Sequence, residues 1–368
     1  MNIGIITTSR ADFGIYLPLL RKIRERNHEF FLFVGGMHTS ADFGNSYLLI
    51  EKEGFAIAEK LKGLSGKDSP EGVAQSMAST LEEYARIWPK YQAKLDVVFV
   101  LGDRFEMYAA ASSLIPFNIP IAHLHGGEIT LGAMDNKFRH AITMLCDFHF
   151  TSHEKHAQKV EEMLGRNHNV FNVGSLGVQS LMSEELFSPQ QFQEKFSFDI
   201  TQQFILTTIH PETLSLGKNK EYITQFIDAI KEINFPVLCT LPNADTEGGI
   251  IREVLLDFEK KYPQKIKCFE NLGFKGYFTA MKNCSLLVGN TSSGIIEAAS
   301  FKKMVVNLGD RQKGRFAGAN VVNVAFEKKA IVDAVHQLKN KDTSAIVNPY
   351  VQENSAEKIV DFLEKIIQ

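Results

Sequence analysis

Short apolar runs alternate with longer amphipathic stretches along almost the whole chain. The first series of apolar runs predicts β-strands at 2–6, 30–34, 96–101, 120–125 and 148–151. A second series predicts strands at 204–209, 236–241, 265–269, 286–289 and 305–308. Several runs are apolar at every position, as at 97–101, and such runs suit parallel strands that are covered on both faces.

Stretches with apolar positions at helical spacing lie between these runs and predict helices at 73–95, 105–115, 219–233 and 250–262. Strands that alternate with helices in this way build right-handed βαβ units and doubly wound parallel sheets. A polar stretch within 174–189 separates the two series, and a last amphipathic helix is expected at 354–367. The pattern therefore predicts an α/β protein whose Rossmann-like domains occupy 1–178 and 179–350, followed by a C-terminal helix segment at 351–368.

The helix predicted at 73–95 has an apolar face formed by Val73, Met77, Leu81, Tyr84 and Trp88. Such a face packs either inside the protein's own core or against a second subunit. Because the core is the commoner place, we expect these side chains inside the N-terminal domain.

The composition narrows the class of protein. Apolar residues make up 44% and charged residues 23% of the 368 positions, with a formal net charge of −3, which is typical of a globular protein. The chain has no long basic block, and binding to nucleic acid is therefore disfavoured. Its four cysteines form no CxxC pair and fit a reducing compartment. With no apolar run of ~20 residues and no signal-peptide pattern, we expect a cytoplasmic protein that does not enter a membrane.

The clearest chemical motif is the sequence GNTSSGIIE at 289–297, where a strand runs into a hydroxyl-rich turn that opens a helix. The first N–H groups of a helix lack partners within it and bind anions, so the backbone from Ser292 to Gly294 is a candidate phosphate site. The hydroxyls of Ser292 and Ser293 add donors, and Glu297 could accept bonds from ribose. The alternative is a plain serine cap with a solvated glutamate. The chain has neither a Walker A loop nor a GxGxxG motif.

Two further residues of the C-terminal half follow predicted strands. Arg311 comes after the strand at 305–308, and its forked guanidinium could bind a phosphate or a base, or form a surface salt bridge. His210 precedes a proline at the end of the strand at 204–209, where it could donate to a phosphate oxygen. A histidine with a purely structural hydrogen bond is the commoner case.

The N-terminal half also places polar residues after predicted strands. Arg10 closes the first strand, Asp103 follows the strand at 96–101, and His125 ends the strand at 120–125 ahead of two glycines. Asp135 lies farther on, just before a probable helix. Asp103 is either a site carboxylate at a carboxyl-end loop or the N-cap of the next helix.

Histidines with loosely ligand-like spacing occur at His149, His153 and His156. The segment from His153 to His156 opens a charged helical stretch, which we interpret as a solvated face. We therefore expect no metal site.

Six motifs occur together and in order: TSRAD at 8–12, GDRFE at 102–106, HLHGGE at 123–128, TIHPET at 208–213, NTSSGIIE at 290–297 and GDRQKGR at 309–315. On these residues, over 2–323, the chain resembles the hydrolysing UDP-N-acetylglucosamine 2-epimerases of sialic-acid-type sugar synthesis. The resemblance implies a glycosyltransferase-B-like fold in which two Rossmann-like domains face a cleft. It also implies a homodimer that uses no metal and no nicotinamide cofactor.

The resemblance also implies roles for individual residues. UDP would be held by Arg10 at the diphosphate and by a second set that consists of His210, Asn243, Ser292, Ser293, Gly294, Glu297 and Arg311. Asp103 and Asp135 fall where relatives keep catalytic carboxylates. His125 stands where many relatives have glutamate, and the histidine form is similar to enzymes that act on UDP-N,N′-diacetylbacillosamine on the way to legionaminic acid.

The reaction implied by the resemblance eliminates UDP to give a bound glycal, which water then converts into a free sugar with the mannose configuration. The substrate is UDP-N-acetylglucosamine or its 2,4-diacetamido-6-deoxy analogue. His125 could act as a base because the ordinary pKa of histidine is near working pH. Two other functions stay open on the same architecture: a glycosyltransferase that uses a UDP-sugar, and a nucleotide-sugar sensor without catalysis.

Overall fold

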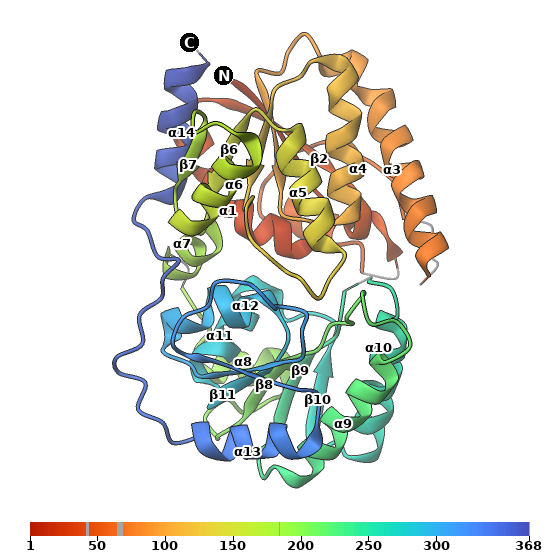
Figure 1. Ribbon diagram of the computed structural model, residues 1–368, viewed down its shortest axis with the longest axis vertical. Helices are drawn as coiled ribbons and strands as arrows, with labels where there is room; N and C mark the ends of the chain where they lie inside the picture. The colour runs from red at the N-terminus through yellow and green to blue at the C-terminus, as the bar shows by residue number, and fades with distance from the viewer. Residues whose placement is uncertain (42–43, 65–68, 184, 244, 368) are drawn as a thin grey trace. The chain divides into compact units, whose positions relative to one another are not determined.

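A computed structural model describes residues 1–41, 44–64, 69–183, 185–243 and 245–367. It divides the chain into two compact units (Figure 1). The first unit contains Met1–Glu128, Asp135–Met182 and Tyr350–Gln368, and the second contains Ile129–Met134 and Ser183–Pro349. The chain passes from the first unit to the second after Met182 and returns after Pro349. The expected domain boundaries, after residues 178 and 350, lie within a few positions of these two points.

The first unit is built on a parallel sheet with the order β3-β2-β1-β4-β5-β6-β7. The strands are β1 (Asn2–Thr7), β2 (Glu29–Val34), β3 (Ile57–Lys60), β4 (Val97–Leu101), β5 (Ile121–Leu124), β6 (Phe148–Thr151) and β7 (Val170–Asn172). The helices are α1 (Arg10–Glu25), α2 (Tyr47–Lys52), α3 (Pro70–Tyr91), α4 (Phe105–Leu114), α5 (Asp135–Leu145), α6 (Glu154–Leu164), α7 (Leu176–Ser183) and α14 (Ser355–Ile366). One apolar core joins the sheet to α1 and α14, and a second joins it to α3 and α4.

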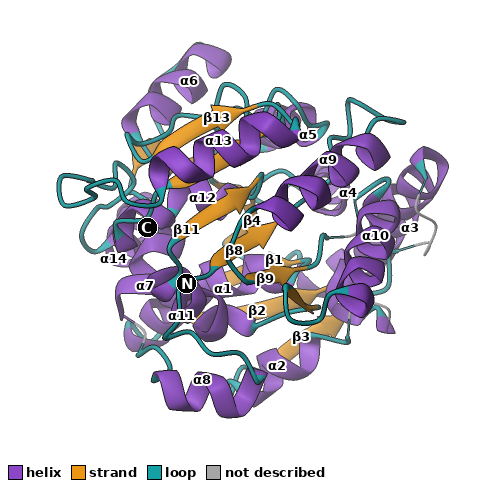
Figure 2. Cartoon of the chain, turned by 90° about the horizontal axis from the view of Figure 1, so that it is seen from below, coloured by secondary structure: helices purple, strands orange, loops and turns teal. Residues whose placement is uncertain are grey.

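The second unit is built on a parallel sheet with the order β10-β9-β8-β11-β12-β13. Its strands are β8 (Ile205–Thr208), β9 (Val237–Thr240), β10 (Ile266–Phe269), β11 (Leu286–Gly289), β12 (Val305–Leu308) and β13 (Val321–Val324). Its helices are α8 (Pro189–Phe196), α9 (Asn219–Glu232), α10 (Gly248–Lys261), α11 (Gly273–Asn283), α12 (Ser292–Ile296) and α13 (Lys328–Leu338). The largest core of this unit packs α9, α10 and α13 on the sheet. Figure 2 shows the strands and helices in separate colours.

The predicted strands and helices are confirmed to within a few residues at their ends, and so is the parallel, doubly wound α/β class. Three strands were not predicted: β3 and β7, the edges of the first sheet, and β13, an edge of the second. Each has only three or four residues, none of them fully buried. β3 (IAEK) and β7 (VFN) have no apolar run of four residues that a sequence could show, whereas β13 (VVNV) has the same pattern as the predicted β12 (VVNL) and was missed in spite of it.

The C-terminal helix α14 packs on the first unit, against α1. Ile359, Val360 and Leu363 are fully buried in the core that α1 shares with the sheet. The segment that precedes this helix also contacts the first unit: Ser175 N donates to Tyr350 O at 3.1 Å. The last helix is therefore part of the first Rossmann-like unit.

The apolar face expected on α3 is buried only at its C-terminal end. Tyr84 and Trp88 are 1% and 0% exposed, whereas Leu81 is 44% exposed. In the first half of the helix the buried positions include Ser76 and Thr80, so the expectation that the whole apolar face lies in the core is wrong. Among the described residues, no helix has both the length and the apolar character needed to cross a bilayer.

The order of strands reverses at one point in each sheet, between β1 and β4 in the first and between β8 and β11 in the second. In open parallel sheets, ligands bind outside the carboxyl ends of the strands at such a switch point. The topology therefore directs attention to the loops that follow these four strands.

Candidate active site

The turn after β11 is anchored by Asn290, which is 0% exposed. Its side chain accepts from His210 N at 2.7 Å and donates to His210 O at 2.8 Å, so it joins the loops that follow β8 and β11. Its own carbonyl accepts from Arg311 Nη1 at 3.2 Å and from Gln312 Nε2 at 2.9 Å. One asparagine therefore holds three polar loops together at the switch point of the second sheet.

The hydroxyl-rich turn opens α12 at Ser292, as the sequence predicts, but the helix ends at Ile296 and continues as a 3₁₀ turn. A helix this short has a small dipole, so the local N–H groups and hydroxyls matter more than the helix as a whole. Ser293 Oγ lies 2.6 Å from Tyr277 Oη and 3.3 Å from Thr291 Oγ1. Burial raises the pKa of Tyr277 to about 12, which keeps its hydroxyl protonated beside Ser293.

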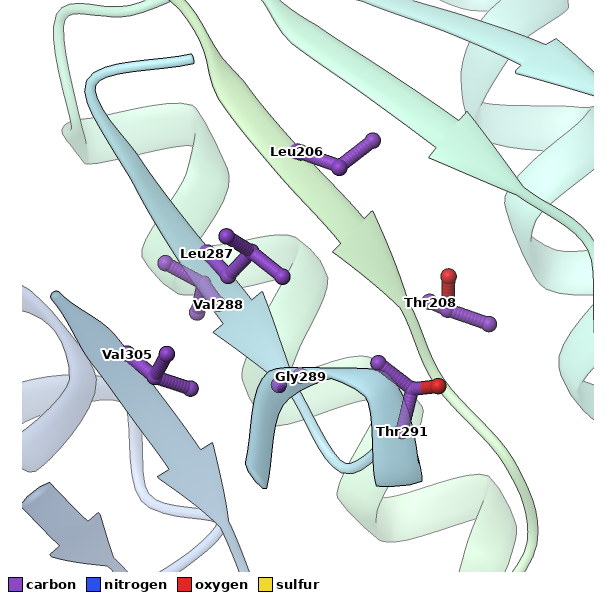
Figure 3. Close-up of a pocket in the computed structure, with 8 residues that line it drawn as sticks. Leu206, Thr208, Leu287, Val288, Gly289, Thr291 and Val305 are labelled. Atoms are coloured by element: carbon purple, nitrogen blue, oxygen red, sulfur yellow. The ribbon is translucent and has the colours of Figure 1, made fainter. Parts of the chain in front are cut away.

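A small pocket lies at this turn, with the side chains of β8 and β11 along it (Figure 3). A Cβ added at Gly289 would lie 2.4 Å from Thr208 O, so only glycine lets the two strands approach this closely. A Cβ at Gly294 would lie 3.1 Å from Val305 Cγ1, which explains a small residue on α12. The pocket is lined by Leu206, Thr208, Leu287, Val288, Gly289, Thr291, Gly294 and Val305.

The loop after β12 carries Arg311, and its backbone is bound by the side chain of Glu212. Glu212 is 3% exposed, and its Oε1 accepts from Asp310 N at 2.6 Å and from Arg311 N at 3.2 Å. Burial raises the pKa of Glu212, although the two backbone donors oppose this shift. A Cβ at Gly309, where φ is +67°, would collide with the same carboxylate. The guanidinium of Arg311 is thus carried by a fixed loop and not by a freely moving one.

His210 and Asn243 follow β8 and β9 at the same edge of the sheet. His210 is 7% exposed, and its Nδ1 lies 3.9 Å from Asp245 Oδ2. The same carboxylate oxygen lies 4.0 Å from Arg311 Nη2. Asn243 is half-buried in the loop that contains Asp245. The second unit therefore brings His210 and Arg311 together around Asp245.

Glu297 sits at the end of α12 and is 7% exposed. Burial raises the pKa of Glu297 to about 8, and only the residue's own backbone N–H acts in the opposite direction. A solvated glutamate is thus the wrong interpretation of this position. In the protein without ligand, this carboxyl is mostly protonated at neutral pH.

The segment Ile129–Met134 belongs to the second unit, although it lies between β5 and α5 in the chain. Leu131 N donates to Lys313 O at 2.9 Å, and Met134 N donates to Thr213 Oγ1 at 2.9 Å. A Cβ at Gly132 would lie 2.1 Å from Asp310 O. The segment Ile129–Met134 therefore contacts the loop that carries Arg311. In the sequence, this segment lies directly between Glu128 and Asp135.

At the carboxyl edge of the first sheet, the charged side chains form a buried network. Arg139 on α5 is 2% exposed and forms an ion pair with Asp103, the second residue after β4. Arg139 Nη1 also lies 3.9 Å from Oε2 of Glu128, which is fully buried. The N-cap of α4 is Arg104, so Asp103 is not the helix cap. With its side chain 23% exposed, Asp103 is the accessible carboxylate of this network.

His125 follows β5 with φ at +66°, a left-handed conformation that is uncommon for residues other than glycine. Its N–H donates to Phe150 O at 3.0 Å, and its ring Nδ1 lies 3.1 Å from Glu128 Oε1. A Cβ at Gly127 would lie 2.2 Å from His156 O, so this glycine lets the loop lie against α6. The structure thus joins His125 to the same glutamate that contacts Arg139.

Asp135 and Arg10 begin helices at this edge. Asp135 is the first residue of α5 and lies one turn before Arg139, on the same side of the helix. Arg10 is the first residue of α1, just after the N-cap Ser9, and is half-buried. Both side chains therefore come from the first residues of helices of the first unit.

The prediction that the segment from His153 to His156 is a solvated face is wrong at His156, although Glu154 and Lys155 are exposed. His153 caps α6, and its ring accepts from Lys155 N at 3.1 Å. His156, in contrast, is 3% exposed, and its Nδ1 lies 3.1 Å from Ser152 Oγ. Burial lowers the pKa of His156 to about 3 and that of His149 to about 3, so both rings are neutral. Among the described residues, no group of three possible ligands could hold a metal ion.

Sequence reasoning missed Asn290, Glu212, Glu128 and Arg139 as parts of the site. Asn290, Glu212 and Glu128 lie within recognised motifs and Arg139 lies outside them, and burial is what distinguishes all four. Arg139 had one available signal, its position four residues after Asp135, which places the two on one helical face.

Comparisons with known proteins place the chain in a family. The family model of UDP-N-acetylglucosamine 2-epimerase matches residues 21–364. The chain is 33% identical over 370 aligned residues to the polysialic acid biosynthesis protein P7 of Escherichia coli, covering 99% of this chain and 93% of that protein. It is 32% identical to the hydrolysing UDP-N,N′-diacetylbacillosamine 2-epimerase of Legionella pneumophila, covering 98% of this chain and 95% of that protein.

The fold is also that of a solved relative. The UDP-GlcNAc 2-epimerase of Methanocaldococcus jannaschii, in complex with UDP-GlcNAc and UDP, superposes with a TM-score of 0.82 at 19% identity and covers 99% of this chain and 100% of that chain. The expected glycosyltransferase-B-like fold of two Rossmann-like domains is thereby confirmed. This chain belongs to the UDP-N-acetylglucosamine 2-epimerase family.

Proposed function

We propose that this protein is a hydrolysing UDP-sugar 2-epimerase that converts UDP-N-acetylglucosamine, or its 2,4-diacetamido-6-deoxy analogue, and water into UDP and the free mannose-configured amino sugar. The observation that carries the proposal is that, in a chain of this family, both sheets bring polar side chains to the carboxyl ends of the strands beside their switch points. Relatives with this reaction in their names match nearly the whole chain.

In this proposal the second unit holds the nucleotide. The N–H groups and hydroxyls of Ser292 and Ser293, together with Arg311 and His210, stabilise the diphosphate as it leaves, and Gly294 keeps the turn close to it. Glu297 accepts from the ribose hydroxyls, and Asn243 contributes from the loop after β9. Because Asn290 and Glu212 fix these loops in advance, little ordering is left to the moment of binding.

The first unit supplies the acid–base chemistry, while Arg10 contributes to the diphosphate. In elimination, the bond from C1 to the UDP oxygen breaks, a base takes the proton on C2, and a C1–C2 double bond forms. Hydration then adds hydroxide at C1 and a proton to the opposite face of C2. Asp103 and Asp135 stabilise the positive charge that builds on the ring as the C1–O bond lengthens, and His125 moves a proton.

Product analysis tests this function directly. UDP-N-acetylglucosamine and UDP-N,N′-diacetylbacillosamine are offered separately, without an acceptor, and the products are followed by NMR. We expect UDP and an inverted free sugar from one or both substrates. Binding without turnover would instead indicate a sensor. UDP release that requires an added acceptor, with the sugar transferred to it, would indicate a glycosyltransferase.

We further propose that the enzyme is a cytoplasmic homodimer, in line with its family. Its few thiols support the compartment. Light scattering of the purified protein tests the dimer, and a monomer at micromolar concentration would contradict it.

A further inference from the structure

A chain of buried polar groups leads away from His125 through Glu128. Glu128 Oε1 lies 3.1 Å from His125 Nδ1 and accepts from Ser152 Oγ at 2.8 Å. On its far side, Ser152 Oγ lies 3.1 Å from His156 Nδ1. His125, Glu128, Ser152 and His156 are 7%, 0%, 1% and 3% exposed, so water does not compete for these bonds.

The protons in this chain have a fixed direction. A carboxylate accepts but cannot donate, so Ser152 uses its only hydrogen toward Glu128 and must accept from His156. His156 is neutral because burial lowers its pKa to about 3, and its Nδ1 therefore carries the hydrogen. By the same reasoning, His125 carries a hydrogen on Nδ1 toward Glu128. The lone pair of a neutral His125 ring then lies on Nε2.

Glu128 is held in place by its other neighbours. Arg139 Nη1 lies 3.9 Å from Oε2, the oxygen that His125 does not approach. Gly127, with φ at +77°, lets the loop lie so close to His156 O that any side chain there would collide. The backbone of His125 itself is in the left-handed region, a conformation that costs of order 1 kcal/mol or more and persists only where surroundings enforce it.

We propose that Glu128 is the positioning residue that fixes the ring orientation and tautomer of His125, so that Nε2 is presented as the proton acceptor for the sugar. This inference rests on the proposed function, in which His125 moves a proton. A carboxylate that holds a histidine Nδ1–H is a general way to set which ring nitrogen reacts.

The first experiment reads the tautomer without using activity. Long-range ¹H–¹⁵N correlation spectra of protein labelled at the histidine nitrogens separate rings protonated at Nδ1 from rings protonated at Nε2, and a His125→Gln spectrum assigns the signal. We expect Nδ1 protonation at His125 in the unaltered protein and in Glu128→Asp. In Glu128→Gln, whose amide can donate or accept, we expect a mixture of tautomers. An Nε2-protonated His125 in the unaltered protein, or a signal that Glu128→Gln leaves unchanged, overturns the proposal.

The second experiment compares turnover with affinity. We expect Glu128→Gln to lower kcat by on the order of 10²-fold, with KM and UDP affinity within about twofold, because only proton transfer is affected. Glu128→Asp should restore part of kcat, and Ser152→Ala should cost only a few-fold. Glu364→Gln is the matched control, since it removes the carboxylate from another His–Glu pair, with His28 Nε2 at 2.8 Å, and should leave kcat unchanged.

The outcomes separate this inference from the proposed function. If the unaltered enzyme releases no UDP from either sugar nucleotide, the proposed function fails whatever the tautomer of His125. If the enzyme is active but Glu128→Gln retains kcat within twofold, only the positioning role fails. If Glu128→Gln lowers UDP affinity by the same factor as kcat, or clearly lowers the melting temperature, Glu128 is merely structural. The milder variants Glu128→Asp and Ser152→Ala then allow the same comparison of kcat with affinity and melting temperature.

Discussion

The carboxyl edges of the two sheets present different chemistry. At the first sheet, Asp103, Arg139 and Glu128 form a buried network of charges. At the second sheet, the turn after β11 offers hydroxyls and N–H groups. Among the described residues, the two buried glutamates at this edge form no such network with an arginine side chain. Glu212 accepts backbone N–H groups, while burial keeps Glu297 mostly protonated.

This difference fits the two tasks of the proposed reaction. Charge that develops on a sugar ring is stabilised best by groups whose charges are already fixed in a dry environment, since nothing has to reorganise during the step. A diphosphate must be bound and then released, for which many weak donors and two arginines, Arg311 and Arg10, are sufficient. Apart from Arg10, we therefore expect substitutions at the first edge to change turnover and those at the second edge to change affinity.

The largest expected effect is at the first edge. Asp103→Asn and Asp135→Asn should each lower kcat by roughly 10²–10⁴-fold, because the amide keeps the shape but loses the charge. UDP affinity, measured by calorimetry, should stay within about twofold. Near-normal turnover in both variants would remove these residues from the catalytic set and would break the contrast between the edges.

The next effect is on nucleotide affinity. Arg311→Ala should weaken UDP binding by roughly 10–100-fold, since a charge-assisted hydrogen bond contributes about 1.5–3 kcal/mol. Lys313→Ala is the matched control, because the side chain of this nearby cation is 61% exposed and forms an ion pair with Asp310 on the surface. Calorimetry that finds equal affinities for the two variants would contradict the proposed nucleotide site.

A smaller effect tests the segment Ile129–Met134. Gly132→Ala adds a Cβ that would lie 2.1 Å from Asp310 O and 2.7 Å from Arg311 N, so the loop after β12 must move. Such overpacking costs about 1 kcal/mol or more, and UDP affinity should fall roughly fivefold. Leu131→Ala, which trims a side chain that is 52% exposed and leaves its backbone bond to Lys313 intact, should have no effect on affinity. Unchanged affinity in Gly132→Ala would show that this segment does not position Arg311.

The contrast between the edges could be predicted from the sequence only in outline. Apolar runs and turn chemistry located the strands and the loops that carry Asp103, His125, Ser292 and Arg311. They could not show that Glu297 is buried, because a glutamate one turn into a helix looks the same in sequence whether it faces solvent or a core. His156 was assigned to the surface for the same reason.

The connecting residues were harder still. Asn290 and Arg139 act through partners 80 and 36 positions away, His210 and Asp103, and no local pattern records such a contact. On α3, the buried stripe passes through Ser76 and Thr80 instead of the neighbouring Val73 and Met77, because helix packing and not side-chain type decided the face. Periodicity predicts that a helix has a buried face. It does not predict which face is buried when small polar residues pack against a neighbouring element.

Glu297 provides a test of the second edge by its effect on stability. Its pKa rises from the ordinary 4.5 to about 8 in the folded protein, so the protonated form is favoured by folding. This contribution is fully present below pH 4.5 and is lost as the pH rises through about 8. We expect the melting temperature of the protein without UDP to fall between pH 5 and pH 8 relative to that of Glu297→Gln, measured side by side. Parallel melting curves across this range would contradict the burial of an ionisable group here.

The smallest and most specific effect is the proton balance of UDP binding. If the ribose hydroxyls donate to Glu297, they favour its ionised form, and binding lowers the pKa from about 8. At pH 7 the carboxyl then releases up to about one proton, which appears as a dependence of the binding enthalpy on the ionisation enthalpy of the buffer. At pH 9.5 the group is already ionised, and the release should vanish. Glu297→Gln should abolish the release at pH 7. Proton release that persists in this variant would assign it to another group, and none in the unaltered protein at pH 7 would mean that UDP binds without charging Glu297.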